Sequence, residues 1–105
     1  MKLIIAIVSS NDEDRVSLGL TKGGFSATKL ATTGGFLKMG NTTFLVGVED
    51  ESVDAVMEVL RACSSRREQM VPVATVGSDV PSVPVSVSVG GATVFITDVE
   101  HFEKL

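Results

Sequence analysis

The chain has 105 residues and a mass of 11.0 kDa, which suits a single domain spanning residues 1–105. Its formal charge is −4, and this acidic balance argues against a nucleic-acid-binding protein. Apolar residues make up 44% and charged residues 21% of the chain, so an intrinsically disordered protein is excluded. The only cysteine, Cys63, excludes a disulfide or a cysteine-based zinc site within one chain.

The N-terminal segment predicts a buried β-strand over Met1–Ser9. Its six consecutive apolar residues, Leu3–Val8, are rich in isoleucine and valine and are followed by a polar turn signal. This apolar run is too short for a signal peptide or a membrane span. We therefore expect a cytoplasmic protein that does not bind membranes, with Cys63 as a reduced thiol.

Two helices are predicted. The first begins at Ser10, whose spacing from Glu13 is that of a capping box, and runs to about Lys22. It ends at the pair Gly23-Gly24, because glycine permits the left-handed conformation that closes many helices. The second helix has apolar residues at the spacing i, i+3, i+4, i+7, with charged residues on the opposite face. These apolar positions are Val53, Val56, Met57 and Leu60.

Two strands are predicted between the helices. Phe25–Thr33 and Thr42–Val48 are both rich in threonine and apolar residues, a composition that favours sheet. The glycine-rich residues 34–41 between them indicate a loop or a hairpin connection.

The C-terminal third predicts three more strands. Met70–Val76 is the first, and the proline- and serine-containing segment Gly77–Pro84 is a loop. Over Val83–Val89, valine alternates with proline or serine, which is the period of a half-buried strand. Ala92–Asp98 follows after a turn at Gly90-Gly91.

This order of elements predicts an α+β fold, the ferredoxin-like βαββαβ sandwich, with an extra C-terminal β-hairpin over residues 83–98. In this fold two helices cover one face of a single antiparallel sheet. The other face stays open, and we expect the C-terminal hairpin either to cover it or to bridge subunits.

Candidate catalytic residues are scarce. His101 has no partner at a motif spacing and is interpreted as an exposed surface residue, and Cys63 is interpreted as a plain buried thiol. The acidic groups 12–14 and 49–51 stand at helix N-termini, where we interpret them as solvated charges that complement the helix dipole. We predict no catalytic residue, no metal site and no resident cofactor, and therefore a protein that is not an enzyme.

Residues 27–43 concentrate hydroxyls, glycines, two lysines, one aromatic and one amide around a turn. Threonine hydroxyls and glycine N–H groups suit phosphate oxygens, while Phe36 and Asn41 suit the face and the edge of a purine. The alternative is an ordinary hairpin with glycines at left-handed positions. The chain has no Walker loop, so ATP hydrolysis has no support.

Four blocks of the sequence resemble the PII-like cyclic di-AMP receptor proteins, small signal-transduction proteins of Gram-positive bacteria and their relatives. The blocks are MKLIIAIV at 1–8, ATKLATTGGFL at 27–37, GNTTFL at 40–45 and GGATVF at 90–95, and Arg67-Glu68-Gln69 also fits. The resemblance implies a PII-like homotrimer of ferredoxin-like domains that binds cyclic di-AMP in clefts between subunits. Binding is then expected to change the conformation of loops and so to regulate a downstream protein of unknown identity.

The resemblance also implies a set of ligand-binding residues. They are Thr28, Gly35, Phe36, Leu37, Asn41, Gly47, Gly90 and Gly91. Thr28 is expected to contact a phosphate, Asn41 to hydrogen-bond the base, and residues 35–37 to border an adenine. Gly47 is expected to allow close approach of the backbone, and Gly90-Gly91 to close the site from the same or the adjoining subunit.

Ser26 departs from the family pattern, because binding members carry arginine at this position. A guanidinium can clamp a phosphate with two charged hydrogen bonds, whereas the Ser26 hydroxyl supplies one neutral bond. Lys29 and Lys38 are candidates to compensate, although Lys29 should face the opposite side of its strand from Thr28. Three alternatives stay open: a sensor of another nucleotide, a regulatory trimer without a ligand, and a small enzyme at the trimer cleft.

Overall fold

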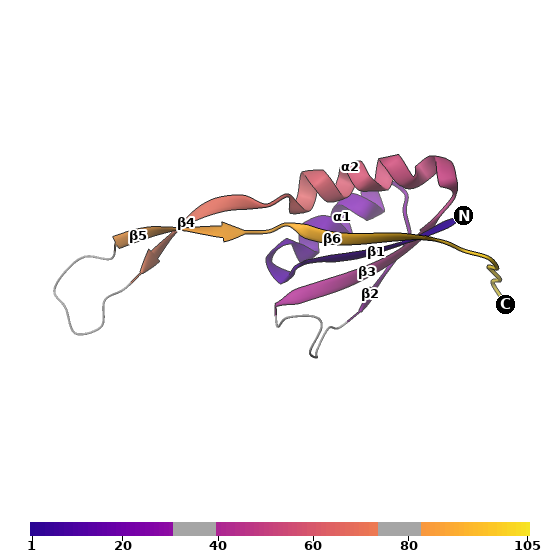
Figure 1. Cartoon of the computed structure of the whole chain (residues 1–105), viewed down its shortest axis with the longest axis horizontal. Coiled ribbons are helices and arrows are strands. Elements are labelled where there is room, and N and C mark those ends of the chain that lie inside the picture. Colours follow the sequence, from indigo (N-terminus) through magenta and orange to yellow (C-terminus); the bar gives the residue numbers. More distant parts are fainter. Residues whose placement is uncertain (31–39, 74–82) are drawn as a thin grey trace.

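The chain forms an α+β sandwich. In the computed structural model, residues 1–30, 40–73 and 83–105 are described, apart from the side chains at positions 69, 71–73, 83–85 and 87. Four antiparallel strands make one sheet in the order β2-β3-β1-β6, and both helices lie on one of its faces (Figure 1). The elements of this body are β1 (Lys2–Ser9), α1 (Glu13–Lys22), β2 (Ala27–Leu30), β3 (Asn41–Val48), α2 (Val53–Ser64) and β6 (Ala92–Asp98). The predicted ferredoxin-like fold class is confirmed.

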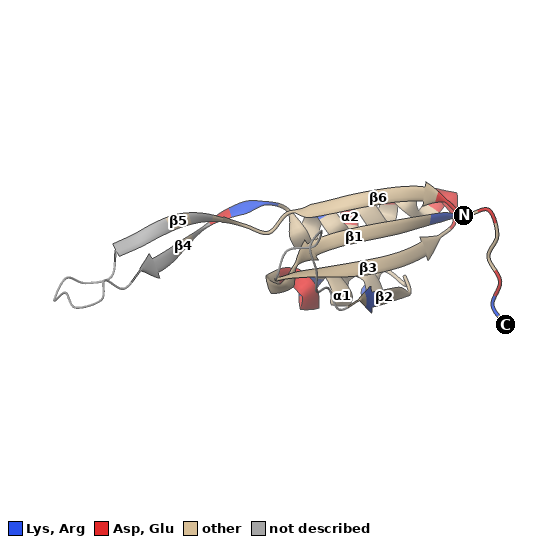
Figure 2. Ribbon diagram, turned by 60° about the horizontal axis from the view of Figure 1, so that its bottom comes forward, with Lys and Arg blue, Asp and Glu red and all other residues tan. Residues whose placement is uncertain are grey.

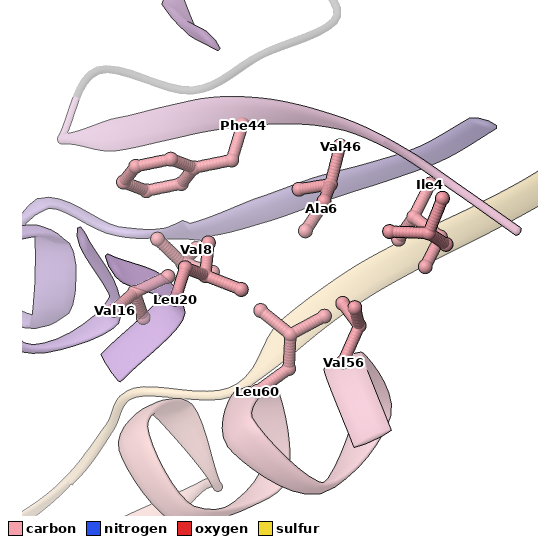
Figure 3. Packing of buried hydrophobic residues seen from close by; sticks show 10 residues of the cluster. Ile4, Ala6, Val8, Val16, Leu20, Phe44, Val46, Val56 and Leu60 are labelled. Atoms are coloured by element: carbon pink, nitrogen blue, oxygen red, sulfur yellow. The ribbon is translucent and has the colours of Figure 1, made fainter. Parts of the chain in front are cut away.

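The core lies between the helices and the sheet (Figure 3). Along β1, Ile4, Ala6 and Val8 are buried, while the intervening side chains point to the other face, as the two-residue period of a strand requires. The other core residues come from β3 and the two helices: Val16, Leu20, Phe44, Val46, Val48, Val56 and Leu60. The second helix therefore buries part of the apolar face that its sequence predicts.

The first helix begins differently from the prediction. Ser9, not Ser10, supplies the cap: its Oγ accepts a hydrogen bond from the Asn11 N–H at 3.3 Å, and a short 3-10 turn over Ser10–Asp12 precedes α1. Glu13 does not reach back to form a capping box, because its carboxylate is bound by Lys29 and Thr42 from the sheet. The predicted helix end is confirmed, with Gly24 at φ +82°.

The C-terminal strands pair differently from the prediction. β4 (Arg67–Val73) does not join the sheet but pairs with β5 (Val83–Val89) in a separate antiparallel ribbon, which we call the arm. β6 pairs with β1 and becomes the fourth strand of the sheet, so residues 83–98 do not form a hairpin of their own. The alternation of valines indicates that a segment is a strand but does not identify its partner.

Two further details of the arm correct the prediction. Pro84 belongs to β5, opposite Pro72 of β4, so the predicted strand Val83–Val89 is confirmed and the overlapping end of the predicted loop at residues 83 and 84 is wrong. Both strands of a two-stranded ribbon are edge strands, which is where proline is tolerated because it lacks an N–H. Gly90 and Gly91, at φ +80° and +90°, redirect the chain from the arm into β6 instead of forming a hairpin turn between paired strands.

The arm projects away from the body and does not cover the open face of the sheet (Figures 1 and 2). This projection gives the molecule an extent of 62 × 27 × 19 Å. Leu3, Ile5 and Ile7 of β1 are half-buried on the open face, and Phe95 beside Ile5 is 48% exposed. Within the described residues of a single chain, this apolar face has no covering element.

No helix among the described residues is long and apolar enough to cross a membrane.

Candidate functional site

A groove of about 650 Å³ opens where the arm joins the body. Its walls come from the end of β1, the start of β3, the C-terminal half of α2 and the chain on both sides of Gly90-Gly91. Asn41, Gly90 and Gly91, three residues predicted to bind ligand, all line this groove. The structure therefore brings together residues that lie about 50 positions apart in the sequence. The volume of the groove is within the range of small-molecule binding sites.

The base of the arm is fixed by a charged joint. Arg67 donates two hydrogen bonds to Asp12, from Nη2 to Oδ1 at 2.8 Å and from Nη1 to Oδ2 at 3.3 Å. Arg15 Nη2 also donates to Asp12 Oδ1, at 2.9 Å. The Asp12 side chain that receives these bonds is fully buried. The hydrogen bond to Asp12 raises the pKa of the Arg67 guanidinium above its ordinary value. The interpretation of Asp12 as a solvated helix charge is therefore wrong, because a partner 55 positions away removes it from water.

Gly90 and Gly91 complete this joint. A Cβ atom at Gly90 would lie 2.6 Å from Arg67 Nη1 and 2.9 Å from the Ser65 carbonyl oxygen, so only glycine fits without a shift. The N–H of Gly91 donates to the Ser64 carbonyl at the end of α2. The two glycines thus hold the end of the arm against the end of the helix, directly at the groove.

Arg66 and Ser88 also lie at the base of the arm and line the groove. Arg66 Nε donates to Ser88 Oγ at 2.7 Å, which links the start of β4 to the end of β5. Figure 2 shows a basic segment where the arm begins. The sequence gives Arg66 no role beyond its place after a helix C-terminus, and its contact with Ser88 depends on a strand pairing that the valine pattern does not reveal.

Thr28 and Gly47 lie apart from the groove, on the open face of the sheet. Thr28 is exposed and stands opposite Leu45 in the β2–β3 ladder. Gly47 is exposed and stands opposite Leu3, and a Cβ atom there would meet nothing within 4 Å. Gly47 lies six positions after Asn41 in β3, a distance of roughly 20 Å along the strand. Contacts within one chain therefore do not explain the glycine at position 47.

The remaining predicted residues divide into two groups. Ser26 is exposed just before β2, and Lys29 faces the helix side of the sheet, opposite to Thr28 as predicted. Gly35, Phe36, Leu37 and Lys38 lie outside the described residues.

Lys29 takes part in a small network beside a second cavity of about 290 Å³. Its Nζ donates to Glu13 Oε1 at 2.8 Å, and Thr42 Oγ1 donates to Glu13 Oε2 at 2.6 Å. The hydrogen bonds from Lys29 and Thr42 lower the pKa of the Glu13 carboxyl, and the bond to Glu13 raises the pKa of Lys29. The network ties β2 and β3 to the start of α1.

The residues with catalytic potential, His101 and Cys63, are not among the residues that line the groove. His101 is exposed, as predicted for a surface histidine, and its Nε2 lies 3.6 Å from Oε2 of Glu103. Cys63 is half-buried, more exposed than predicted, and packs against the hydrophobic core. In the described ranges no group of three or more histidine, cysteine, aspartate or glutamate residues is placed to hold a metal ion.

Comparison with known proteins matches this chain over its whole length to a protein family and to a solved structure. A protein-family model described as a cyclic-di-AMP receptor matches residues 1–105. A solved structure of a functionally unknown protein from Pediococcus pentosaceus ATCC 25745 is 42% identical in sequence, with a TM-score of 0.81. The match covers 99% of this chain and 96% of that chain.

Proposed function

Because this chain belongs to the family of PII-like cyclic-di-AMP receptors, we propose that it binds cyclic di-AMP at the groove and signals occupancy to a partner protein. The observation that carries this proposal is the convergence of Asn41, Gly90 and Gly91 on one groove. Asn41 supplies an amide that can pair with a base edge, and the glycines allow close approach of backbone to ligand. We propose no chemical reaction at this site.

The chemistry of the groove suits an anionic dinucleotide even though the chain is acidic overall. Arg66 lines it together with the hydroxyl-bearing Ser65 and Ser88, whereas the charge of Arg61, another lining residue, is bound by Glu58. The formal charge of −4 excludes broad attraction to nucleic acid, but a local guanidinium with neighbouring hydroxyls provides donors that suit a phosphate.

We further propose that the functional unit is a homotrimer in which the open sheet faces are covered. Packing this face against neighbouring subunits would bury Leu3, Ile5 and Phe95. It would also enclose Thr28 and Gly47, which have exposed positions on the same face. Each ligand site would then combine groove residues with residues that a single chain leaves apart, and Gly47 would admit a neighbouring backbone or the ligand.

Phe95→Lys tests this assembly, because a charge at the centre of an apolar interface is costly to bury. We expect sedimentation of the wild type at three times the mass of one chain and of Phe95→Lys at the mass of one chain. A wild type that sediments as a single chain would contradict the proposed trimer.

Ser26 supports a second candidate, a PII-like sensor of another nucleotide. A hydroxyl in place of a guanidinium loses a charged bidentate contact, which corresponds to roughly 10- to 100-fold in affinity for an anionic ligand. A ligand with fewer phosphate contacts would be affected less.

A thermal-shift panel separates the two candidates, since a ligand that binds only the folded state must raise the melting temperature. The panel consists of cyclic di-AMP, cyclic di-GMP, ATP and ADP, applied to the wild type and to Ser26→Arg. We expect cyclic di-AMP to give the largest shift, and Ser26→Arg to increase it. A larger shift with a mononucleotide would favour the second candidate, and no shift with any nucleotide would favour a regulatory trimer without a ligand.

A further inference from the structure

The four arginines of the chain differ in how their charges are balanced. Arg15 and Arg67 bind Asp12, and Arg61 binds Glu58 at 2.8 Å. Arg66 is the exception: its Nε donates to the neutral hydroxyl of Ser88, and no carboxylate among the described residues lies within ion-pair distance of it. The unneutralised guanidinium therefore belongs to a residue that lines the groove.

The position of Arg66 relative to the other groove residues is well defined. A Cβ atom at Gly91 would lie 3.6 Å from the Cβ of Arg66, so the two backbones are in close contact. Arg66 also directly precedes Arg67, which is fixed to the buried Asp12. The backbone that carries this guanidinium thus lies at the base of the arm, beside the glycine pair and next to the residue bound to Asp12.

We propose that Arg66 binds a phosphate of the ligand and so provides the bidentate cation that Ser26 does not. This inference rests on the proposed function and assigns one further residue to its site. The bond to Ser88 uses only Nε and a neutral acceptor, whereas a phosphate can accept charge-assisted bonds from two nitrogens of the guanidinium. Ser88 is exposed, so water can replace Arg66 as the partner of its hydroxyl at low cost.

The ligand class that this residue selects is an anionic phosphodiester or phosphate ester rather than a neutral nucleoside. Adenosine shares the base with cyclic di-AMP but lacks the phosphates. Arg66 should therefore contribute to the binding of cyclic di-AMP and not to that of adenosine.

Calorimetric titration of Arg66→Gln tests the proposal, with Arg61→Gln as the matched control. Arg61 lines the same groove, but its charge is already bound by Glu58. We expect Arg66→Gln to weaken cyclic di-AMP binding by roughly 10- to 100-fold and Arg61→Gln by less than about threefold. Arg66→Lys, which keeps the charge but not the fork of donors, should fall between Arg66→Gln and the wild type.

Two further readouts separate phosphate binding from a structural role. Raising the ionic strength should weaken binding by the wild type more than by Arg66→Gln, because the variant lacks one charged contact. Thermal denaturation should show the same folded state for both, since the side chain of Arg66 is exposed.

The outcomes distinguish this inference from the function on which it rests. Equal affinities of Arg66→Gln and the wild type for cyclic di-AMP would overturn the role of Arg66 and leave the proposed function in place. Equal losses in Arg66→Gln and Arg61→Gln would also overturn it, because a general charge effect would then suffice. A folded wild type that does not bind cyclic di-AMP would overturn the proposed function and this inference together.

Discussion

The body and the arm of this molecule are stabilised in different ways. Every hydrophobic residue of the buried core belongs to β1, α1, β3 or α2, all in the body (Figure 3). None of the arm side chains that the structure describes is buried, and Met70 is 60% exposed. The arm has the hydrogen bonds of its own ladder and polar cross-strand contacts, such as Ser86 to Glu68 at 2.6 Å. The body is therefore a packed domain, and the arm is a ribbon attached to it.

The attachment between the two regions is electrostatic and steric rather than apolar. The joint is formed by the buried carboxylate of Asp12, the guanidinium of Arg67 and the backbone of Gly90, and it leaves no space for a Cβ atom at position 90. The groove lies directly at this joint. A ligand bound there, as we propose, would contact both regions at once, and this would give a physical route by which occupancy affects the position of the arm. The following substitutions test this contrast between the two regions.

The largest effect is expected in the core of the body. Phe44→Ala should lower the free energy of unfolding by about 3–5 kcal/mol, because Phe44 is only 1% exposed. Phe44→Leu should give a smaller loss, since it leaves a smaller cavity. The matched change in the arm, Met70→Ala, should cost less than about 0.5 kcal/mol. Urea unfolding at a fixed protein concentration measures the free energy of unfolding of all three variants. Equal losses for Phe44→Ala and Met70→Ala would contradict the claim that the core lies in the body and not in the arm.

At the joint, Asp12→Asn should lower the free energy of unfolding by about 2 kcal/mol. The variant loses charge-assisted hydrogen bonds to Arg15 and Arg67 at a fully buried position. Asp14→Asn, an exposed change two residues further on in the first turn of α1, is the control and should cost less than about 0.5 kcal/mol. If chemical denaturation gave both variants the same stability, the joint would have no special role.

A smaller difference is expected between two glycines with similar backbone angles. Gly90→Ala and Gly24→Ala both place a Cβ atom at φ near +80°, which costs about 1–2 kcal/mol in each case. Only at Gly90 does the new atom meet its neighbours, whereas at Gly24 nothing lies within 4 Å. Gly90→Ala should therefore be less stable than Gly24→Ala by about 1 kcal/mol in thermal unfolding. The reverse order would show that the glycine pair is not tightly enclosed.

The smallest effect concerns the pH dependence of stability. The pKa of Glu13 is lowered below its ordinary value of 4.5 by hydrogen bonds from Lys29 and Thr42. The ionised carboxylate therefore stabilises the fold above pH 4.5, and this contribution is lost as the pH falls through the lowered pKa. Glu13→Gln should reduce stability at neutral pH and flatten the acid limb of the stability curve. Parallel curves for the two proteins, measured from pH 7 to about pH 2, would contradict this assignment.

Local signals in the sequence were sufficient for the elements of the body. The apolar run of β1, the 3.6-residue period of α2 and the end of α1 at Gly24 each depend on neighbouring residues only. The pairing of β4, β5 and β6 was predicted wrongly, because a two-residue period does not specify which strand lies alongside. The contact between Asp12 and Arg67 was missed for a related reason, since it depends on the position of the arm.

The candidate site was predictable in part. Asn41, Gly90 and Gly91 were singled out by resemblance, and the fold brings them to one groove. Thr28 and Gly47 remain on the open sheet face, where one chain gives them no shared site. Arg66 was not a candidate, because only the structure shows that no carboxylate among the described residues lies within ion-pair distance of it.

Calorimetric titration of cyclic di-AMP into the wild-type protein tests the central claim most directly. The account predicts saturable binding with one ligand per chain, and no comparable binding of cyclic di-GMP, ATP or ADP. A folded protein that produces no binding heat at high micromolar cyclic di-AMP, at two temperatures, would contradict it.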